Sequence, residues 1–127
     1  DFSLSRGLGD VYKRQESMLD AVTAVSGSGP AYFFLLMEHM IKAGTELGLD
    51  AQTSKTLTLQ TAYGAALMAQ QATESVATLR ENVTSPAGTT EAALNKMLEQ
   101  HVPKAVVSAL HAAHQRSIEL AKEFGKP

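Results

Sequence analysis

The sequence is defined first by what it lacks. It has no cysteine, which excludes a disulfide scaffold and thiol-ligated metal and fits a cytoplasmic protein. The longest apolar run, residues 31–37, is far shorter than the ~18 residues that a membrane span needs, and no apolar segment follows a basic start as in a secretory signal. The net charge is −2 without a basic block, which argues against a nucleic-acid partner. What remains is a chain of 127 residues, 44% hydrophobic, long enough for one folded domain.

Several catalytic and binding motifs are also missing. Gly7-Leu8-Gly9 lacks the third glycine of a dinucleotide loop, and no Gly-Lys-Ser or Gly-Lys-Thr phosphate loop occurs. Gly27-Ser28-Gly29 lacks the spacing of a nucleophile elbow. His111 and His114 share a helical face, but no carboxylate stands beside them at ligand spacing. We therefore expect no metal site and a solvated histidine face.

The first fifteen residues differ from the rest of the chain, since they show neither a helical stripe nor a reliable strand alternation. We interpret residues 1–15 as a non-native or disordered tail, an expression or reading-frame remnant, and exclude it from the fold. Residues 16–127 are expected to form one helical domain.

Helical periodicity dominates the remainder and predicts an all-α fold. The expected helices are residues 16–25, 30–47, 51–72, 76–82, 91–100 and a last helix that Pro103 opens. Gly48 is expected to end one helix, and Asp50 and Ser75 to cap the next two. Ser26–Pro30 is expected to break the first helix. The last helix carries a narrow stripe that suits packing against another helix, from its own chain or a partner: Val106, Leu110, Ala113, Ser117, Leu120 and Phe124.

The helix at residues 30–47 is apolar around almost its whole circumference in its first half. Such a helix is normally buried on every side, which is difficult in so small a domain without a second chain. We therefore expect a dimer. The small residues around Gly64 in the next helix indicate close packing between helices there.

The chain is organised around residues 83–90, where hydroxyls, a proline and a glycine lie between two helical patterns. The first amides of a helix have no internal partner, and the helix dipole favours an anion beside them. We interpret the segment as an anion-binding loop, with Gly88 allowing close approach to the backbone. The alternative is an ordinary helix start capped by Thr89 or Thr90.

Two segments, residues 20–32 and 83–90, resemble pyrroline-5-carboxylate reductase, which reduces the C=N bond of a cyclic imine to make proline. The resemblance covers about residues 18–124 and implies the C-terminal dimerisation domain, an all-α bundle that interleaves with a second copy, without the N-terminal dinucleotide-binding domain. It implies NADPH or NADH as cofactor of the full-length enzyme, none of it bound by this fragment alone. The implied partners are a small-molecule substrate and a second copy, with dimers assembling into a decamer as a pentamer of dimers; neither nucleic acid nor membrane is implied.

The resemblance also implies roles for individual residues. The substrate carboxylate would be held by amides and hydroxyls of Ser85, Gly88, Thr89 and Thr90. The Thr90 hydroxyl would bond the imine nitrogen and help pass a proton to it, Val83 would line the pocket, and Asn82 would touch the cofactor. The family commonly has glycine where Ala87 stands. A different reading remains open, a stand-alone helical self-association module with no catalytic role.

Overall fold

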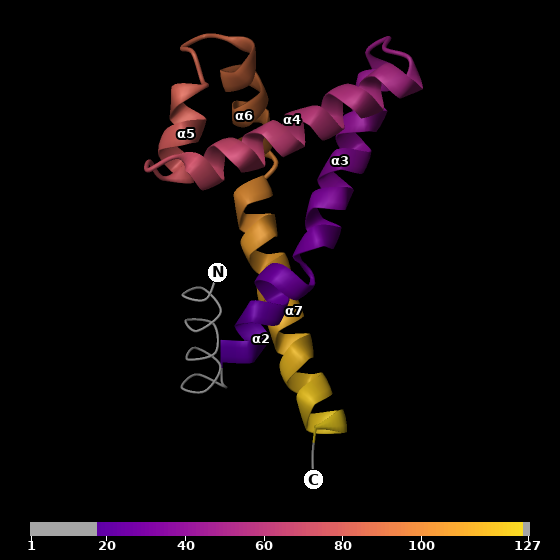
Figure 1. Ribbon diagram of the computed structural model, residues 1–127, viewed down its shortest axis with the longest axis vertical. Coiled ribbons are helices and arrows are strands. Elements are labelled where there is room, and N and C mark those ends of the chain that lie inside the picture. Colours follow the sequence, from indigo (N-terminus) through magenta and orange to yellow (C-terminus); the bar gives the residue numbers. More distant parts are fainter. Residues whose placement is uncertain (1–17, 126–127) are drawn as a thin grey trace. The chain divides into compact units, whose positions relative to one another are not determined.

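The computed structural model describes residues 18–125, and the expectation for residues 1–15 lies outside them (Figure 1). No strand occurs in the described range, so the all-α prediction is confirmed. The elements in order are α2 (Leu19–Val22), the π-helix η2 (Thr23–Gly27), α3 (Gly29–Glu46), α4 (Ala51–Gln71), α5 (Val76–Asn82), α6 (Thr89–Glu99) and α7 (Val102–Phe124). They divide into a central unit, Phe33–Pro103, and a terminal unit made of the residues before and after it.

The terminal unit begins with a helix that changes its winding. α2 continues directly into η2, where the amide of Ser28 donates to the carbonyl of Thr23 at 2.8 Å, five residues back. The Tyr32 hydroxyl donates to the Ala24 carbonyl at 2.8 Å, which gives that carbonyl a partner beside the widened turn. The break expected within Ser26–Pro30 is confirmed at Ser28, although the π turn carries the first helix on through Gly27 and α3 begins at Gly29.

α2 and α7 meet within the terminal unit. The Ser117 hydroxyl donates to the Asp20 carboxylate at 2.6 Å, across 97 residues of sequence. Asp20, in the first turn of α2, therefore also bonds a neighbouring helix. Of the stripe predicted on α7, Leu110, Ala113 and Ser117 are half-buried, whereas the other three members are exposed. This stripe is thus only partly covered by its own chain.

An open hollow of about 300 Å³ lies in the terminal unit between the same elements. Its lining is Ala21, Ala24, Val25, Leu110, His111 and His114. His111 is exposed but His114 is half-buried, so the prediction of a solvated histidine face holds for His111 alone. Within residues 18–125 no group of three or more histidine, aspartate or glutamate side chains is arranged to hold a metal ion.

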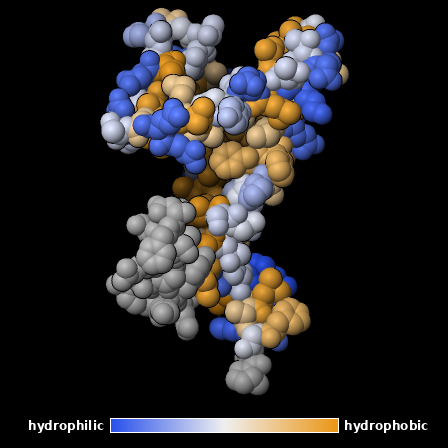
Figure 2. All heavy atoms as spheres, in the orientation of Figure 1, coloured by the Kyte–Doolittle hydropathy of each residue, from blue (hydrophilic) through white to orange (hydrophobic). Residues whose placement is uncertain are grey.

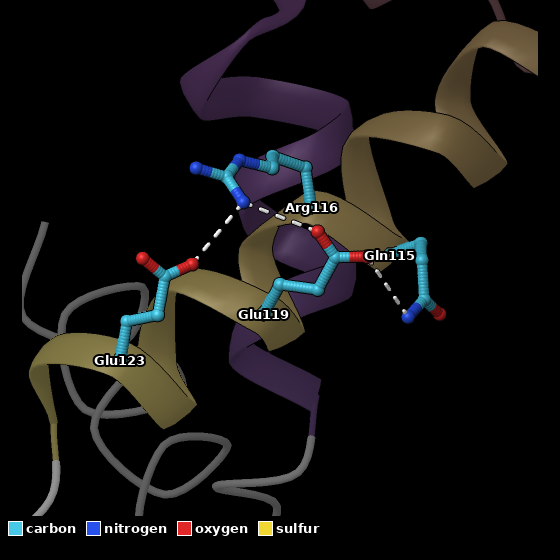
Figure 3. Close-up of polar contacts among 4 residues, drawn as sticks. All are labelled: Gln115, Arg116, Glu119 and Glu123. Carbon is cyan, nitrogen blue, oxygen red and sulfur yellow. Dashed lines mark hydrogen bonds and ion pairs between the residues drawn. The ribbon is translucent and has the colours of Figure 1, made fainter.

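The exposed side of α7 carries a small charged cluster (Figure 3). Arg116 Nη1 contacts Glu119 Oε1 at 3.1 Å and Glu123 Oε2 at 3.3 Å, while Gln115 donates to the other Glu119 oxygen at 3.4 Å. Exposed pairs of this kind contribute about 0–1 kcal/mol each. The cluster marks a solvated helix face.

α3 and α4 are joined by a tight, hydrogen-bonded connection. Gly48 has a φ of 109°, its amide donates to Thr45, and the Leu49 amide donates to the Gly44 carbonyl. This is the Schellman pattern that a left-handed glycine permits. Asp50 then caps α4, since its carboxylate accepts from the Thr53 amide at 2.8 Å. Both capping predictions are confirmed.

α3 and α4 approach each other closely at Gly44 and Ser54. A Cβ added to Gly44 would lie 2.0 Å from the Ser54 hydroxyl oxygen. Ser54 is 2% exposed and donates to the Ile41 carbonyl at 2.8 Å. At Gly64, by contrast, an added Cβ meets nothing within 4 Å among the described residues. The prediction of close packing at Gly64 is therefore wrong for the single chain, and Gly44 holds that role.

The central unit buries almost none of its large apolar side chains. The two residues of α4 that are buried, Ser54 and Thr58, are polar. On α3 the exposed apolar side chains are Phe33, Phe34, Leu35, Leu36 and Met40. Figure 2 shows hydrophobic side chains at the molecular surface. No helix in the described part of the chain has the length and apolar character needed to cross a membrane. The exposed apolar side chains of the central unit indicate a contact surface for another protein.

Candidate functional site: the loop that opens α6

The loop between α5 and α6 follows directly on α5 (Figure 1). α5 is a short helix with a side-chain N-cap. The Ser75 hydroxyl accepts from the Thr78 amide at 3.1 Å, as predicted for the start of α5. α5 ends at Asn82, and the Val83 amide still bonds back to the Leu79 and Arg80 carbonyls. The Thr84 amide also bonds back, to the Glu81 carbonyl at 3.0 Å, so the segment from Ser85 onward is the first part free of the helix.

Residues 85–88 form a tight turn. The Gly88 amide donates to the Ser85 carbonyl at 3.1 Å, Pro86 fixes φ at the second position, and Ala87 has a φ of 59° at the third. Proline followed by a residue of positive φ defines a type II turn, in which the third position usually holds glycine. An L-residue in this conformation costs about 1–2 kcal/mol. Ala87 is therefore strained, and a glycine at this position would relieve the positive φ.

The N-cap of α6 is Gly88, whose φ of −92° and ψ of −177° are ordinary extended values. A Cβ at Gly88 would lie 3.2 Å from the Ser85 carbonyl oxygen, so glycine leaves room for the tight turn. Thr89 and Thr90 are the first and second helical residues. The alternative in which one of these threonines caps the helix is therefore wrong, because the capping position has no side chain.

The helix start consequently presents free backbone donors. The first intrahelical bond runs from the Ala92 amide to the Gly88 carbonyl at 3.2 Å. The amides of Thr89, Thr90 and Glu91 precede it, and no hydrogen bond within residues 18–125 engages them. The Gly88 amide donates to the Ser85 carbonyl within the turn, and its contact with a carboxylate stays a prediction. Three amides at the positive end of the helix dipole form a natural binding place for a carboxylate or phosphate.

The side chains predicted for the site are exposed to solvent. Ser85, Thr89 and Thr90 are exposed, and no hydrogen bond within the described range engages their hydroxyls. Val83 is 59% exposed and Asn82 is exposed at the end of α5. Because the hydroxyls and the amides are available together, the segment can donate several hydrogen bonds to one small anion.

Glu91 is the one residue at this site that the sequence reasoning missed. Its Oε1 accepts from the Ala87 amide at 3.0 Å, and the side chain is half-buried. A glutamate three residues after the cap commonly reaches back to backbone amides before the helix, as in a capping box. That spacing was the signal that could have found it.

The fold and this loop define an all-helical domain with a solvent-open helix start, whose N-cap residue has no side chain, and with a large uncovered apolar surface. Residues 16–120 match the family described as pyrroline-5-carboxylate reductase dimerisation. The chain belongs to this family.

Curated relatives agree with this assignment. The chain is 56% identical over 111 residues to a pyrroline-5-carboxylate reductase of Pseudomonas aeruginosa, which covers 87% of this chain and 41% of the relative. It is 42% identical over 119 residues to pyrroline-5-carboxylate reductase 1 of Bacillus subtilis, covering 94% of this chain and 40% of that protein. The chain thus spans about two fifths of the length of these relatives.

Solved structures show the same fold. A pyrroline-5-carboxylate reductase of Coxiella burnetii superposes with a TM-score of 0.80 at 44% identity, over 84% of this chain and 39% of that one. A Plasmodium falciparum pyrroline carboxylate reductase, solved with NADP bound, gives a TM-score of 0.79 at 37% identity, over 81% of this chain and 42% of that one. The helical arrangement is therefore that of a domain within a larger reductase.

Proposed function

We propose that this chain is the dimerisation and substrate-holding domain of a reductase that converts 1-pyrroline-5-carboxylate to L-proline. The observation that carries the proposal is the 56% identity to the Pseudomonas aeruginosa reductase. The three free amides at the start of α6 supply a physical reason for it, since the substrate carries a carboxylate beside its ring imine. The proposal places that carboxylate on the amides of Thr89, Thr90 and Glu91.

The side chains around the amides would orient the rest of the substrate. The Ser85 and Thr89 hydroxyls would donate to the carboxylate, and the exposed Val83 side chain would contact the apolar ring carbons. The Thr90 hydroxyl would bond the imine nitrogen and help pass a proton to it, taking up a replacement proton from solvent, as the ring carbon accepts hydride. The contribution of this chain would therefore be positioning and proton delivery. Asn82 as a cofactor contact stays a prediction.

We expect that this chain alone binds no nicotinamide dinucleotide. Residues 18–125 contain neither a strand nor the glycine-rich turn after a strand that usually receives its phosphates. NADPH or NADH would supply the hydride from a part of the reductase outside this chain, as the family resemblance implies. No reduction is therefore expected from the 127-residue chain alone; measurable NADPH oxidation by the purified chain would contradict this.

The proposed partner is a second copy. The uncovered apolar side chains of α3 support a homodimer. Apolar side chains that their own small domain leaves exposed in this number need a partner to cover them. Assembly of dimers into a decamer and a cytoplasmic location stay predictions.

The test uses the full-length reductase that carries this chain, assayed by NADPH absorbance with 1-pyrroline-5-carboxylate. Thr90→Ala should lower turnover about 100-fold while the dimer persists, because general acids contribute on that scale. Thr84→Ala is the control, since its hydroxyl already donates to the Arg80 carbonyl. A wild-type rate for Thr90→Ala would remove the assigned role, and an inactive wild-type enzyme would remove the proposed function.

A further inference from the structure

The turn before α6 depends on the orientation of one peptide group. Type I and type II turns share the bond from the fourth amide to the first carbonyl, and they differ by a flip of the peptide between the second and third residues. Here that peptide joins Pro86 to Ala87. The bond from Gly88 to Ser85 is compatible with either form, so it does not select between them.

Glu91 is placed to make that selection. Its Oε1 lies 3.0 Å from the Ala87 nitrogen, which belongs to the peptide that would flip. In a type I turn the same peptide would present the Pro86 carbonyl oxygen to this carboxylate, and the two oxygens would repel each other. The charge-assisted hydrogen bond from the Ala87 amide to Glu91 thus favours the type II form.

The selection matters because residue 87 is alanine. Its φ of 59° is a conformation that alanine avoids and glycine adopts freely. The preference of the residue itself therefore opposes the observed turn, and a contact from elsewhere must outweigh it. The half-buried Glu91 side chain supplies that contact from the first turn of α6.

We propose that Glu91 is a positioning residue for the carboxylate site. It holds the Pro86–Ala87 peptide in the type II orientation, which sets the Ser85 hydroxyl and the free amides of α6 around one anion. This inference rests on the proposed function, since the anion is taken to be the carboxylate of a cyclic imino acid. Glu91 acts through the turn and not by touching the substrate with its side chain.

The structure supplies a specific rescue experiment. If Glu91 acts by holding residue 87 at positive φ, then Ala87→Gly makes it dispensable. Binding of L-proline to the full 127-residue chain is followed by amide NMR shifts for wild type, Glu91→Ala, Glu91→Gln, Ala87→Gly and the double variant Ala87→Gly/Glu91→Ala. Glu99→Ala is the matched control, because it removes a carboxylate from the exposed other end of the same helix.

We expect Glu91→Ala to weaken proline binding about tenfold, the size of one lost hydrogen bond to a charged group. Glu91→Gln keeps an acceptor oxygen and should bind within about threefold of wild type, and the double variant should match Ala87→Gly. Removing a negative charge near a carboxylate site would by itself strengthen binding. Unchanged or tighter binding by Glu91→Ala, or no rescue by Ala87→Gly, would therefore overturn the proposal.

A second readout needs no ligand. Exchange of the Ala87 amide hydrogen should be faster in Glu91→Ala than in wild type or Glu99→Ala, because its acceptor is gone. Equal exchange rates would show that the Glu91 carboxylate does not hold the Ala87 amide, even if proline binds. This hydrogen bond from Ala87 to Glu91 is called the clamp below. A wild-type chain that shows the slow Ala87 amide but binds no proline would contradict the proposed function and leave the clamp standing. Glu91→Gln, which preserves the side-chain volume, covers the case in which Glu91→Ala fails to fold.

Discussion

The exposed apolar face of α3 predicts that a single aromatic truncation will weaken self-association strongly. Phe33 is 63% exposed in the single chain, and Leu36 and Met40 follow it on the same helical face. Full burial of a phenylalanine side chain contributes about 1.5–3 kcal/mol. Because nearly two thirds of Phe33 is still uncovered, a partner would gain about 1–2 kcal/mol per copy from covering it.

In a two-fold symmetric dimer the substitution occurs twice. Phe33→Ala should therefore cost about 2–4 kcal/mol of association free energy, which raises the dissociation constant about 30- to 1,000-fold. Val76→Ala is a suitable control, since Val76 is also exposed but lies at the start of α5. Its dissociation constant should stay near that of the wild type.

Sedimentation equilibrium over a dilution series measures the dissociation constant directly. Urea unfolding at several chain concentrations adds a second measure, because the midpoint of a dimer depends on concentration. A wild-type chain that is monomeric and folded at every concentration would refute the reasoning. So would a Phe33→Ala variant whose dissociation constant equals that of Val76→Ala.

Three further predictions concern the turn before α6, the contact between α3 and α4, and the cap of α4. Ala87→Gly should raise the free energy of unfolding by about 0.5–1 kcal/mol in urea, because glycine relieves the positive φ; a loss of stability would contradict the strain. Gly44→Ala should cost about 1–3 kcal/mol by overpacking, unlike Gly64→Ala; equal effects would exclude the close contact. Hydrogen bonds from Thr53 lower the pKa of Asp50 from its ordinary value of 3.8, so stability should fall on acidification below that value, and Asp50→Asn should flatten this dependence in pH-resolved unfolding.

The helices could be predicted from the sequence because their signals are local. Apolar spacing, the carboxylate of Asp50, the hydroxyl of Ser75 and the glycine at position 48 act within one or two turns of the residues they affect. The same local reasoning placed the break within residues 26–30 but missed the π turn before it, since the bond from Ser28 to Thr23 spans five residues and the Tyr32 hydroxyl supports it from the next helix.

Contacts between distant segments were not predictable in this way. Gly44 meets Ser54, and Ser117 bonds Asp20, only after the helices have packed. At the site, the sequence located the loop and its hydroxyls but named a threonine as the possible cap. In the structure Gly88 is the N-cap, because residues 85–88 form the turn and the helix begins at the next residue. Burial by a second chain leaves no signal in a sequence beyond excess apolar residues, such as those of α3.

A crystal structure of the chain grown with L-proline tests the central claim most directly. The account predicts the proline carboxylate within about 2.7–3.2 Å of the Thr89 and Thr90 amides, and a second copy of the chain against α3. Proline bound elsewhere, or free α6 amides together with an uncovered α3, would contradict it.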